Sequence, residues 1–364
     1  MIKTLLKVFV TLALLAAIAA AGAAYWAWQK IHQPHRAWSG DAAELIIKPG
    51  TSALRILALL EENGVIVDQR LARVYLVYKL EDPPLLAGEY RFDEALNTPQ
   101  ALDKLIRGEV QTHPVTLIEG LTFQEAAEAL AAAGFGRLDI FLAEVSDPSR
   151  ISDLDPEASN LEGYLYPDTY HFARGTGEKE IVDTLVRTFR QRYEKEVAPL
   201  LADLPPDYKP QLDLRSLVTL ASIVEKETQL EEERPLVASV YSNRLRIGMG
   251  LYADPTIIYG KKLDGTWDGN LRRADLRAES PYNTYRVPGL PPSPICSPSL
   301  ASLLAALAPA ETDYFYFVSR NDGSHVFAQS KQEHDRNVYK WQKLYWRKRW
   351  AEERRQRAEA NPGG

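Results

Sequence analysis

The chain has 364 residues, of which 45% are hydrophobic and 25% charged. That is enough apolar material for a buried core in more than one domain, and it excludes an intrinsically disordered protein. The formal net charge of −6 gives no basic footprint of the kind that nucleic-acid binders carry, so no nucleic-acid partner is expected. The single cysteine, Cys296, rules out an intrachain disulfide, which suits the cytoplasm and equally a protein that folds outside it without disulfides.

The N-terminus predicts a membrane anchor. Residues 8–28 carry no charge and, at about 1.5 Å per residue, form a helix long enough to cross a bilayer. Trp26 and Trp28 stand where interfacial aromatic residues are expected, and Lys3 and Lys7 favour a cytoplasmic location for residues 1–7. The alternative is a cleaved signal peptide, whose apolar region is normally shorter. We expect the rest of the chain to lie outside the cytoplasm.

After a polar linker at 29–41, a pattern of strand, turn and helix recurs. The expected elements are strands at 44–48, 88–92 and 115–118, and helices at 52–63, from Pro99 onward with Thr98 as the cap, and at 122–133. The helix at 122–133 begins with a capping box formed by Thr122 and Glu125. Small units of this kind can build a carbohydrate-binding module, but generic packing of an α+β fold explains the same periodicity.

Aromatic residues are concentrated in the segment LEGYLYPDTY at 161–170. Three tyrosines, a glutamate and an aspartate surround Pro167, a combination that sugar-binding clefts use because a pyranose ring has an apolar face and a polar edge. The alternative is that these tyrosines pack in the core.

The stretch LASIVEKET at 220–228 is predicted to be the end of an amphipathic helix. Glu225 and Glu227 leave opposite flanks of its apolar stripe, about 160° apart, and so do not form a catalytic pair. Glu227 emerges beside Leu220 and Ile223, where apolar neighbours raise the pKa of a carboxyl and suit it to general acid catalysis. Glu225 could orient its neighbours or form a salt bridge. The alternative is that both are the polar border of an ordinary helix.

Four further motifs follow in order: ASVYSNRLRIG at 238–248, ADPTIIYG at 253–260, YNTY at 282–285 and GLPPSPI at 289–295. With the EKET element at 225–228, they closely resemble the signature of MltG-type (YceG-like) endolytic murein transglycosylases. The resemblance spans roughly residues 42–341. Five motifs in the same order make it specific, whereas any one alone would be weak.

The resemblance implies that Glu227 is the catalytic residue and that Glu225, the first glutamate of the element, supports it. The family cleaves peptidoglycan strands between N-acetylmuramic acid and N-acetylglucosamine and leaves 1,6-anhydromuramoyl ends. One carboxyl suffices for this non-hydrolytic lyase reaction, because the sugar's own 6-hydroxyl replaces water as the nucleophile. No cofactor is implied.

The resemblance also suggests substrate-binding residues within the matched motifs. They are Asn243, Asp254, Tyr259, Tyr282, Asn283 and Tyr285. For each of them, a structural role in a cap or turn is the alternative. The family further carries a LysM-like subdomain, which would occupy residues 42–112 here, with Tyr90 and Phe92 as exposed candidates for glycan contact. The catalytic domain would then comprise residues 113–340.

Two features near the C-terminus are separate from these motifs. Asn321-Asp322-Gly323 predicts the turn of a β-hairpin, YFVSRNDGSHVF at 316–327, that contains His325. His325 and His334 lack the spacing of a zinc site, so no metal is expected and a structural or substrate-edge role is preferred.

The tail at 341–364 is basic and aromatic: residues 340–360 hold eight Lys or Arg against three Glu. It suits an anionic bilayer surface, an acidic partner or a solvated helix.

These observations predict an α+β protein anchored in a bacterial inner membrane by one transmembrane helix, with its catalytic Glu on a helix in the periplasm. Peptidoglycan strands are the expected substrate, nascent strands being trimmed or terminated, and cell-wall synthases are candidate partners. The alternative from another class is a non-catalytic glycan-binding scaffold of the cell-wall synthesis machinery. The intact EKET element argues against that alternative.

Overall fold

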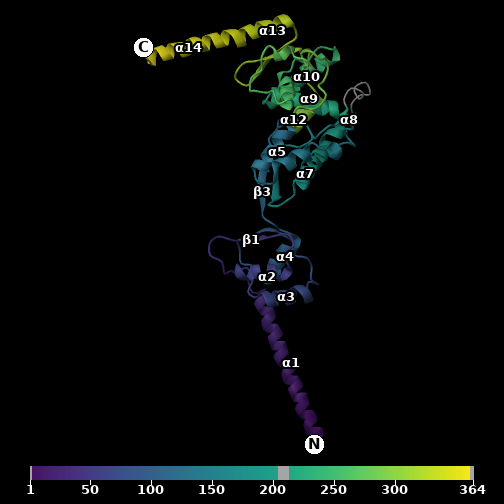
Figure 1. The fold of residues 1–364 in the computed structure, drawn as a ribbon, viewed down its shortest axis with the longest axis vertical. Coiled ribbons are helices and arrows are strands. Elements are labelled where there is room, and N and C mark those ends of the chain that lie inside the picture. Colours follow the sequence, from purple (N-terminus) through teal and green to yellow (C-terminus); the bar gives the residue numbers. More distant parts are fainter. Residues whose placement is uncertain (1, 204–212, 361–364) are drawn as a thin grey trace. The chain divides into compact units, whose positions relative to one another are not determined.

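The computed structural model describes residues 2–203 and 213–360 and divides into two compact units (Figure 1). Unit 1 comprises Met1–Pro114 with His171–Thr176, and unit 2 comprises Val115–Tyr170 with Gly177–Gly364. The described strands form three two-stranded sheets, β1 with β2, β3 with β4, and β5 with β6, among many helices. The predicted mixed α+β class is therefore confirmed.

Helix α1 (Ile2–His32) contains the apolar stretch predicted as an anchor. By length and composition its segment Leu6–His32 is compatible with a single membrane span. The helix continues to His32 and so takes in the start of the predicted linker. The rest of that linker is packed: His35 forms an isolated bridge with Leu96, and the Ala37 N–H donates to the Gly64 carbonyl at 3.0 Å.

Unit 1 has the order strand, helix, helix, strand, helix. Its elements are β1 (Ala43–Ile47), α2 (Ala53–Glu62), α3 (Gln69–Tyr78), β2 (Gly88–Phe92) and α4 (Thr98–Arg107). The two strands pair antiparallel, with Ala43 opposite Phe92 and Ile47 opposite Gly88. Alternate residues of β1 face the core, as expected for a strand with one buried face.

Two expectations for this unit were wrong. Tyr90 and Phe92, predicted to be exposed, are 0% and 1% exposed, because both lie on the inner face of β2 and pack in the core of the unit. The Tyr90 hydroxyl is satisfied inside the protein by the Leu86 carbonyl at 2.9 Å. Helix α4 is capped by Asn97, which forms a capping box with Gln100, so Thr98 is its first residue and not its cap.

The chain then passes into β3 (Thr112–Thr116), which pairs with β4 (Thr169–Ala173). β3 begins three residues before the predicted strand. Helix α5 (Phe123–Ala132) has the predicted capping box of Thr122 and Glu125. The three tyrosines of the LEGYLYPDTY segment are buried, as the packing alternative required.

The remaining helices and strands of unit 2 follow in chain order. They are α6 (Leu138–Val145), α7 (Glu178–Arg192), α8 (Ala198–Asp203), α9 (Leu214–Glu227), α10 (Arg234–Arg246), α11 (Asp254–Leu263), α12 (Leu300–Leu307), the hairpin β5 (Tyr316–Ser319) and β6 (His325–Ala328), α13 (Lys331–Val338) and α14 (Tyr345–Ala360). Short 3₁₀ helices occupy Pro148–Arg150, Glu231–Glu233 and Asp275–Arg277, and π-helical segments occupy Tyr193–Val197 and Tyr339–Leu344.

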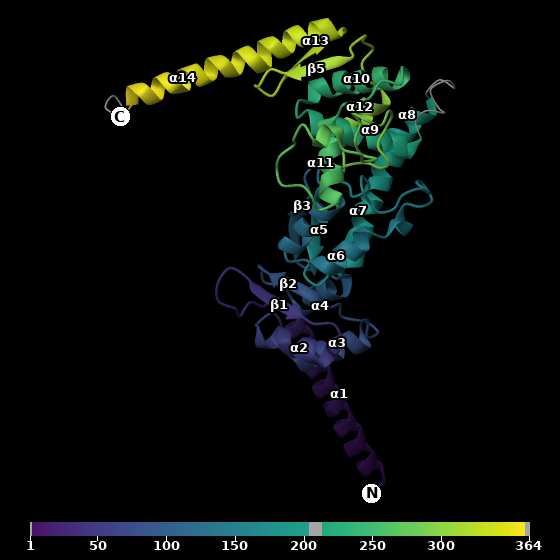
Figure 2. The same cartoon turned by 45° about the horizontal axis from the view of Figure 1, so that its top comes forward.

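Helices α9, α10 and α12 pack against one another, and the β5–β6 hairpin lies against α10 (Figure 2). The predicted hairpin is confirmed, with Asn321 in its turn at φ 65°. Gly163 lets the LEGYLYPDTY segment approach this helical group, since a Cβ there would lie 2.7 Å from side-chain atoms of Val218 and Pro294. Its φ of 87° also favours glycine.

Candidate active site

Helix α9 ends at Glu227. The helix begins at an Asp213 cap, whose carboxylate accepts from the Ser216 N–H at 2.7 Å, and its middle residues are almost entirely buried. It stops because Thr228 adopts an extended conformation, with φ −140° and ψ 139°. A buried helix with a sharp end holds Glu227 at a fixed position where the side chain is still partly exposed.

Among the residues that the structure describes, one side chain donates a hydrogen bond to the Glu227 carboxyl. The Tyr241 hydroxyl on α10 donates to Glu227 Oε1 at 2.7 Å. Burial raises the pKa of Glu227 to about 7, and the negative charge of Asp254 adds to this rise. The Tyr241 hydrogen bond and the Arg244 charge act in the opposite direction. At neutral pH the carboxyl is therefore shared between its acid and base forms, as a group that both gives and takes a proton requires.

The sequence interpretation missed Tyr241 and Arg244. They lie three residues apart on α10 and so share a face of that helix. Arg244 donates from Nε to the Phe315 carbonyl at 2.7 Å and from Nη1 to the Leu251 carbonyl. Its guanidinium lies over the rings of Tyr241, Tyr252 and Tyr316, with centroid distances of 5.8, 5.6 and 5.6 Å. The sequence could have predicted that they share a helix face, because Tyr241 and Arg244 stand three residues apart within ASVYSNRLRIG.

Asp254 and Tyr285, two of the predicted substrate-binding residues, are joined directly. The Tyr285 hydroxyl donates to Asp254 Oδ1 at 2.7 Å. The ring of Tyr252 packs edge-on against that of Tyr285, with centroids 5.3 Å apart, and its side chain is 43% exposed. Tyr252 has φ 51°, a conformation that a bulky residue adopts only where its surroundings impose it. This conformation places the Tyr252 ring against Tyr285, the hydrogen-bond partner of Asp254.

Glu225 has different surroundings. Its carboxylate accepts from the Ser299 N–H at 2.8 Å, at the start of α12, and from Arg234 Nη2 at 3.1 Å. Burial favours the neutral form of Glu225, but the hydrogen bonds from Ser299 and the Arg234 charge outweigh it, so its pKa is lowered. Glu225 is thus an ionised residue that ties α9 to α10 and α12. Of the two roles predicted for Glu225, the structure shows the salt bridge, which it forms with Arg234.

Two of the predicted substrate ligands have their amides occupied within the protein. Asn243 Nδ2 donates to the Thr312 and Tyr314 carbonyls at 2.8 and 3.0 Å. Asn283 is 0% exposed, and its Nδ2 donates to the Ala278 carbonyl at 2.7 Å. Both amides therefore hold loops around the site, and sugar contact by Asn283 is not supported by this geometry.

Tyr259 and Tyr282 pack against each other, with ring centroids 5.1 Å apart. The Tyr282 hydroxyl lies 2.8 Å from Ser293 Oγ. Tyr259 is buried beside Glu162, and the interaction between the Tyr259 hydroxyl and the Glu162 carboxyl contributes to the pKa of both groups. Burial raises the pKa of Glu162 to about 8. Tyr259 and Glu162 thus form an interior polar pair, and the predicted contact of Tyr259 with sugar is not supported by this geometry.

The two histidines of the C-terminal region are structural neighbours of the site. His325 Nδ1 lies 2.7 Å from Glu233 Oε2, and the His325 N–H donates to Glu233 Oε1 at 2.8 Å. His334 stacks on Tyr316, with centroids 5.1 Å apart. Across residues 2–203 and 213–360, no three His, Cys, Asp or Glu side chains cluster as metal ligands would.

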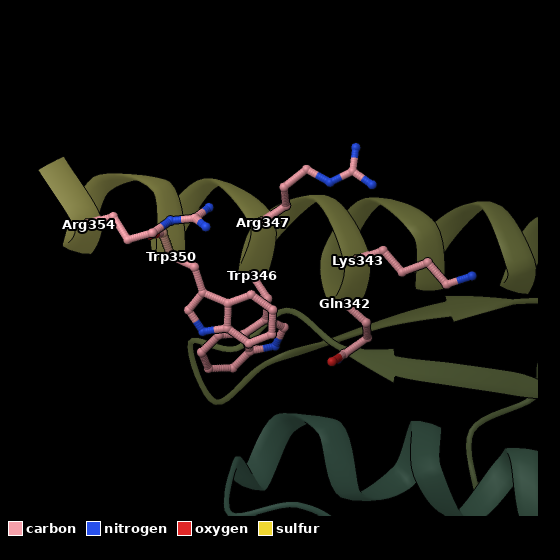
Figure 3. Close-up of a pocket in the computed structure, with 6 residues that line it drawn as sticks. All are labelled: Gln342, Lys343, Trp346, Arg347, Trp350 and Arg354. Atoms are coloured by element: carbon pink, nitrogen blue, oxygen red, sulfur yellow. The ribbon is translucent and has the colours of Figure 1, made fainter.

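The C-terminal tail is helical and forms its own surface. Asn321 Nδ2 donates to the Trp341 carbonyl at 2.6 Å, which holds the start of the tail against the hairpin turn. Figure 3 shows Trp346 and Trp350 together on one side of α14, with ring centroids 6.2 Å apart, and Arg347 pointing away from them. None of the residues around Glu227 contributes to this surface.

Comparisons with known proteins agree with the motif pattern. A model of the YceG-like family matches residues 45–340. The chain is 28% identical over 339 residues to the endolytic murein transglycosylase of Bacillus subtilis strain 168, covering 88% of this chain and 90% of that protein. It is 29% identical over 329 residues to the enzyme of the same name from Streptococcus pneumoniae serotype 2 strain D39, covering 80% of this chain and 57% of that protein.

A solved structure shows the same architecture. The crystal structure of a yceG-like protein from Listeria monocytogenes has a TM-score of 0.53 and 30% sequence identity to this chain. The match covers 82% of this chain and 99% of that one.

Proposed function

The chain belongs to the YceG-like family, and we propose from this that it is an endolytic murein transglycosylase with Glu227 as its proton carrier. It cleaves peptidoglycan strands as a lyase, a proposal supported by relatives that are named endolytic murein transglycosylases. The bond cleaved is that between N-acetylmuramic acid and N-acetylglucosamine, and the product carries a 1,6-anhydromuramoyl end. The observation that carries the proposal is the carboxyl of Glu227 at the end of α9, whose pKa is raised to about 7.

One carboxyl accounts for both proton transfers. Protonated Glu227 gives its proton to the glycosidic oxygen as the bond from that oxygen to C1 of the muramoyl sugar breaks. The 6-hydroxyl oxygen of the same sugar then bonds to C1, and its proton passes to the Glu227 carboxylate. The carboxyl is regenerated in its starting form, and no water is consumed. An internal nucleophile needs no second carboxylate to position it, in contrast to hydrolytic glycosidases.

The residues around Glu227 have complementary tasks. The Tyr241 hydrogen bond fixes the orientation of the carboxyl, and the Arg244 charge stabilises its ionised form. Asp254 and Tyr285 form a polar pair for sugar hydroxyls, and the exposed Tyr252 ring offers an apolar face to a pyranose. Glu225 is a positioning residue that keeps the end of α9 in place.

The remaining parts of the chain bring the catalytic unit to its substrate and hold it at the membrane. The order β1, α2, α3, β2 of unit 1, with its own core, supports a LysM-like module at residues 42–112. Deleting this module should weaken action on whole sacculi more than on short soluble glycans, and equal losses would contradict a delivery role.

The α1 helix anchors the chain with its catalytic part outside the cytoplasm. A reporter enzyme that works only in the cytoplasm, fused after Gly364, should therefore be inactive.

The decisive experiment uses the full chain in detergent with purified murein. We expect anhydromuramoyl ends in the products by mass spectrometry, and their absence with the Glu227→Gln variant. Products with reducing ends would show a hydrolase, and binding without any cleavage would show a scaffold. Either result would overturn the proposed reaction.

A further inference from the structure

His325 and Glu233 form a largely buried pair close to the end of α9. The Glu233 carboxylate accepts from the His325 backbone N–H at 2.8 Å, and its Oε2 lies 2.7 Å from His325 Nδ1. The side chains of His325 and Glu233 are only 11% and 10% exposed. Because a carboxylate accepts hydrogen bonds, Nδ1 is the donor in this contact. The pair therefore fastens β6, which begins at His325, to the 3₁₀ turn that ends at Glu233.

One contact of this pair leads to the residue that follows Glu227. Thr228 Oγ1 donates to Glu233 Oε2 at 3.4 Å and accepts from the Leu230 N–H at 3.1 Å. Thr228 is 3% exposed, and α9 ends there because its backbone is extended. Glu233 thus helps to hold the turn by which the chain leaves the catalytic carboxyl.

A second contact leads to Tyr241. The ring of His325 lies edge-on against that of Phe317, with centroids 5.4 Å apart. Phe317 in turn lies edge-on against Tyr241, with centroids 6.0 Å apart. Edge-to-face pairs at such separations are favourable and directional, so they restrict how each ring can turn. Phe317, on β5, therefore connects His325 to the tyrosine whose hydroxyl donates to Glu227.

We propose that His325 is a positioning residue for the reaction: held by Glu233, it keeps both partners of the Tyr241–Glu227 hydrogen bond in place. Thr228 carries its effect to the carboxyl, and Phe317 carries it to the hydroxyl. The inference rests on the proposed function and deepens it, since it assigns a part in proton transfer to the β5–β6 hairpin. The competing explanation is that the pair only stabilises the hairpin, in which case its loss leaves Glu227 unaffected.

The test is a pH–rate profile of the full chain in detergent on glycan strands from purified murein. His325→Leu removes the Nδ1 donor and the ring, so kcat should fall about 5- to 10-fold. The KM should change less than about twofold, because His325 is not proposed to touch the sugar. The alkaline limb should move to higher pH, since the Tyr241 hydrogen bond lowers the pKa of Glu227. His325→Asn, whose amide can still donate to Glu233, should show a smaller shift.

A double variant and a control separate positioning from mere stabilisation. In the Tyr241→Phe background, His325→Leu should shift the limb no further, because the bond on which it acts is gone. Asn321→Gly alters the same hairpin: it tolerates the φ of 65° but loses the donor to the Trp341 carbonyl, and it should leave the limb in place. Shifts that add in the double variant, or His325 variants that lower only the melting temperature, would overturn the inference.

A measurement without substrate distinguishes this inference from the proposed reaction. Infrared titration of the protonated Glu227 carboxyl, identified by the loss of its band in Glu227→Gln, reports its pKa directly. That pKa should rise in His325→Leu. A rise in a protein that forms no anhydromuramoyl ends would contradict the proposed function and leave the positioning role assigned. An unchanged pKa in the His325 variants of an active enzyme would exclude that role.

Discussion

Tyr241 and Glu227 are joined across the contact between α10 and α9 by a hydrogen bond of 2.7 Å from the tyrosine hydroxyl to Oε1. This bond favours the ionised carboxyl, whereas burial and the Asp254 charge favour the protonated one. The near-neutral pKa of Glu227 is the balance of these effects. The Tyr241 hydrogen bond and the Asp254 charge can each be removed separately by a substitution that preserves shape.

Replacing Glu227 with Gln should abolish proton transfer and retain the fold. Gln can still accept the Tyr241 hydrogen bond, but it carries no transferable proton, so turnover should fall by about 10²–10⁴ or more. The melting temperature should stay the same or rise slightly, because an uncharged side chain is easier to bury. Anhydro-product formation and thermal unfolding measure the two effects. Undiminished turnover would show that another group carries the proton.

Replacing Tyr241 with Phe should move the pH profile upward. The hydroxyl lowers the pKa of Glu227, so its loss raises that pKa and shifts the alkaline limb of kcat/KM to higher pH. Loss of one hydrogen bond should also reduce kcat about 5- to 10-fold at the optimum. A pH–rate profile checks both. An alkaline limb that moved to lower pH would contradict the role assigned to the hydroxyl.

Replacing Asp254 with Asn should move the same limb the other way. The Asp254 charge raises the pKa of Glu227, so a neutral amide lowers that pKa and shifts the alkaline limb to lower pH. The amide oxygen can still accept from Tyr285, which keeps the local geometry. Opposite shifts in the Asp254 and Tyr241 variants are the expected signature, and shifts in the same direction would refute this electrostatic account.

Replacing Glu225 with Gln should affect stability more than chemistry. It leaves Arg234, whose side chain is only 12% exposed, without its charge partner, so the free energy of unfolding should fall by about 2–4 kcal/mol at neutral pH. Because the folded-state pKa of Glu225 is lowered, its ionised form stabilises the fold above the unfolded pKa, and this contribution is lost as pH falls through the folded value. Denaturant unfolding at pH 7 and at low pH tests this. Glu231→Gln, an exposed neighbour, is the control.

Replacing Glu162 with Gln should flatten the loss of stability between about pH 4.5 and pH 8. The folded pKa of about 8 lies above the usual value of 4.5, so between these values the folded state holds a proton that the unfolded state has lost, and stability falls as pH rises through this window. Within that window each pH unit costs up to about 1.4 kcal/mol of unfolding free energy, and the loss levels off above about pH 8. The variant should therefore lose less stability than the wild type between about pH 5 and pH 8, measured by denaturant unfolding. A wild type that gains stability over this range, with the variant unchanged, would exclude a buried neutral Glu162.

The sequence by itself determined the local elements of this protein. The apolar length of α1, the capping box of Thr122 and Glu125, and the turn at Asn321-Asp322-Gly323 act between residues close in the chain, so their patterns predict them directly. The opposite flanks of Glu225 and Glu227 follow from helical periodicity in the same way. The order of five motifs was enough to identify the family.

Only the tertiary structure decided which partner each side chain meets. The alternation of side chains along β2 predicts that Tyr90 and Phe92 share one face of the strand. Whether that face is buried depends on where α2 and α4 pack. Asn243, Tyr259 and Asn283 lie in matched motifs. The amides of Asn243 and Asn283 nevertheless donate to backbone carbonyls of the protein, and Tyr259 is buried. The Tyr241 hydroxyl and the Arg244 charge act on Glu227 only because α10 packs against α9. A pKa depends on burial and on charges distant in sequence, and these exist only once the chain has folded.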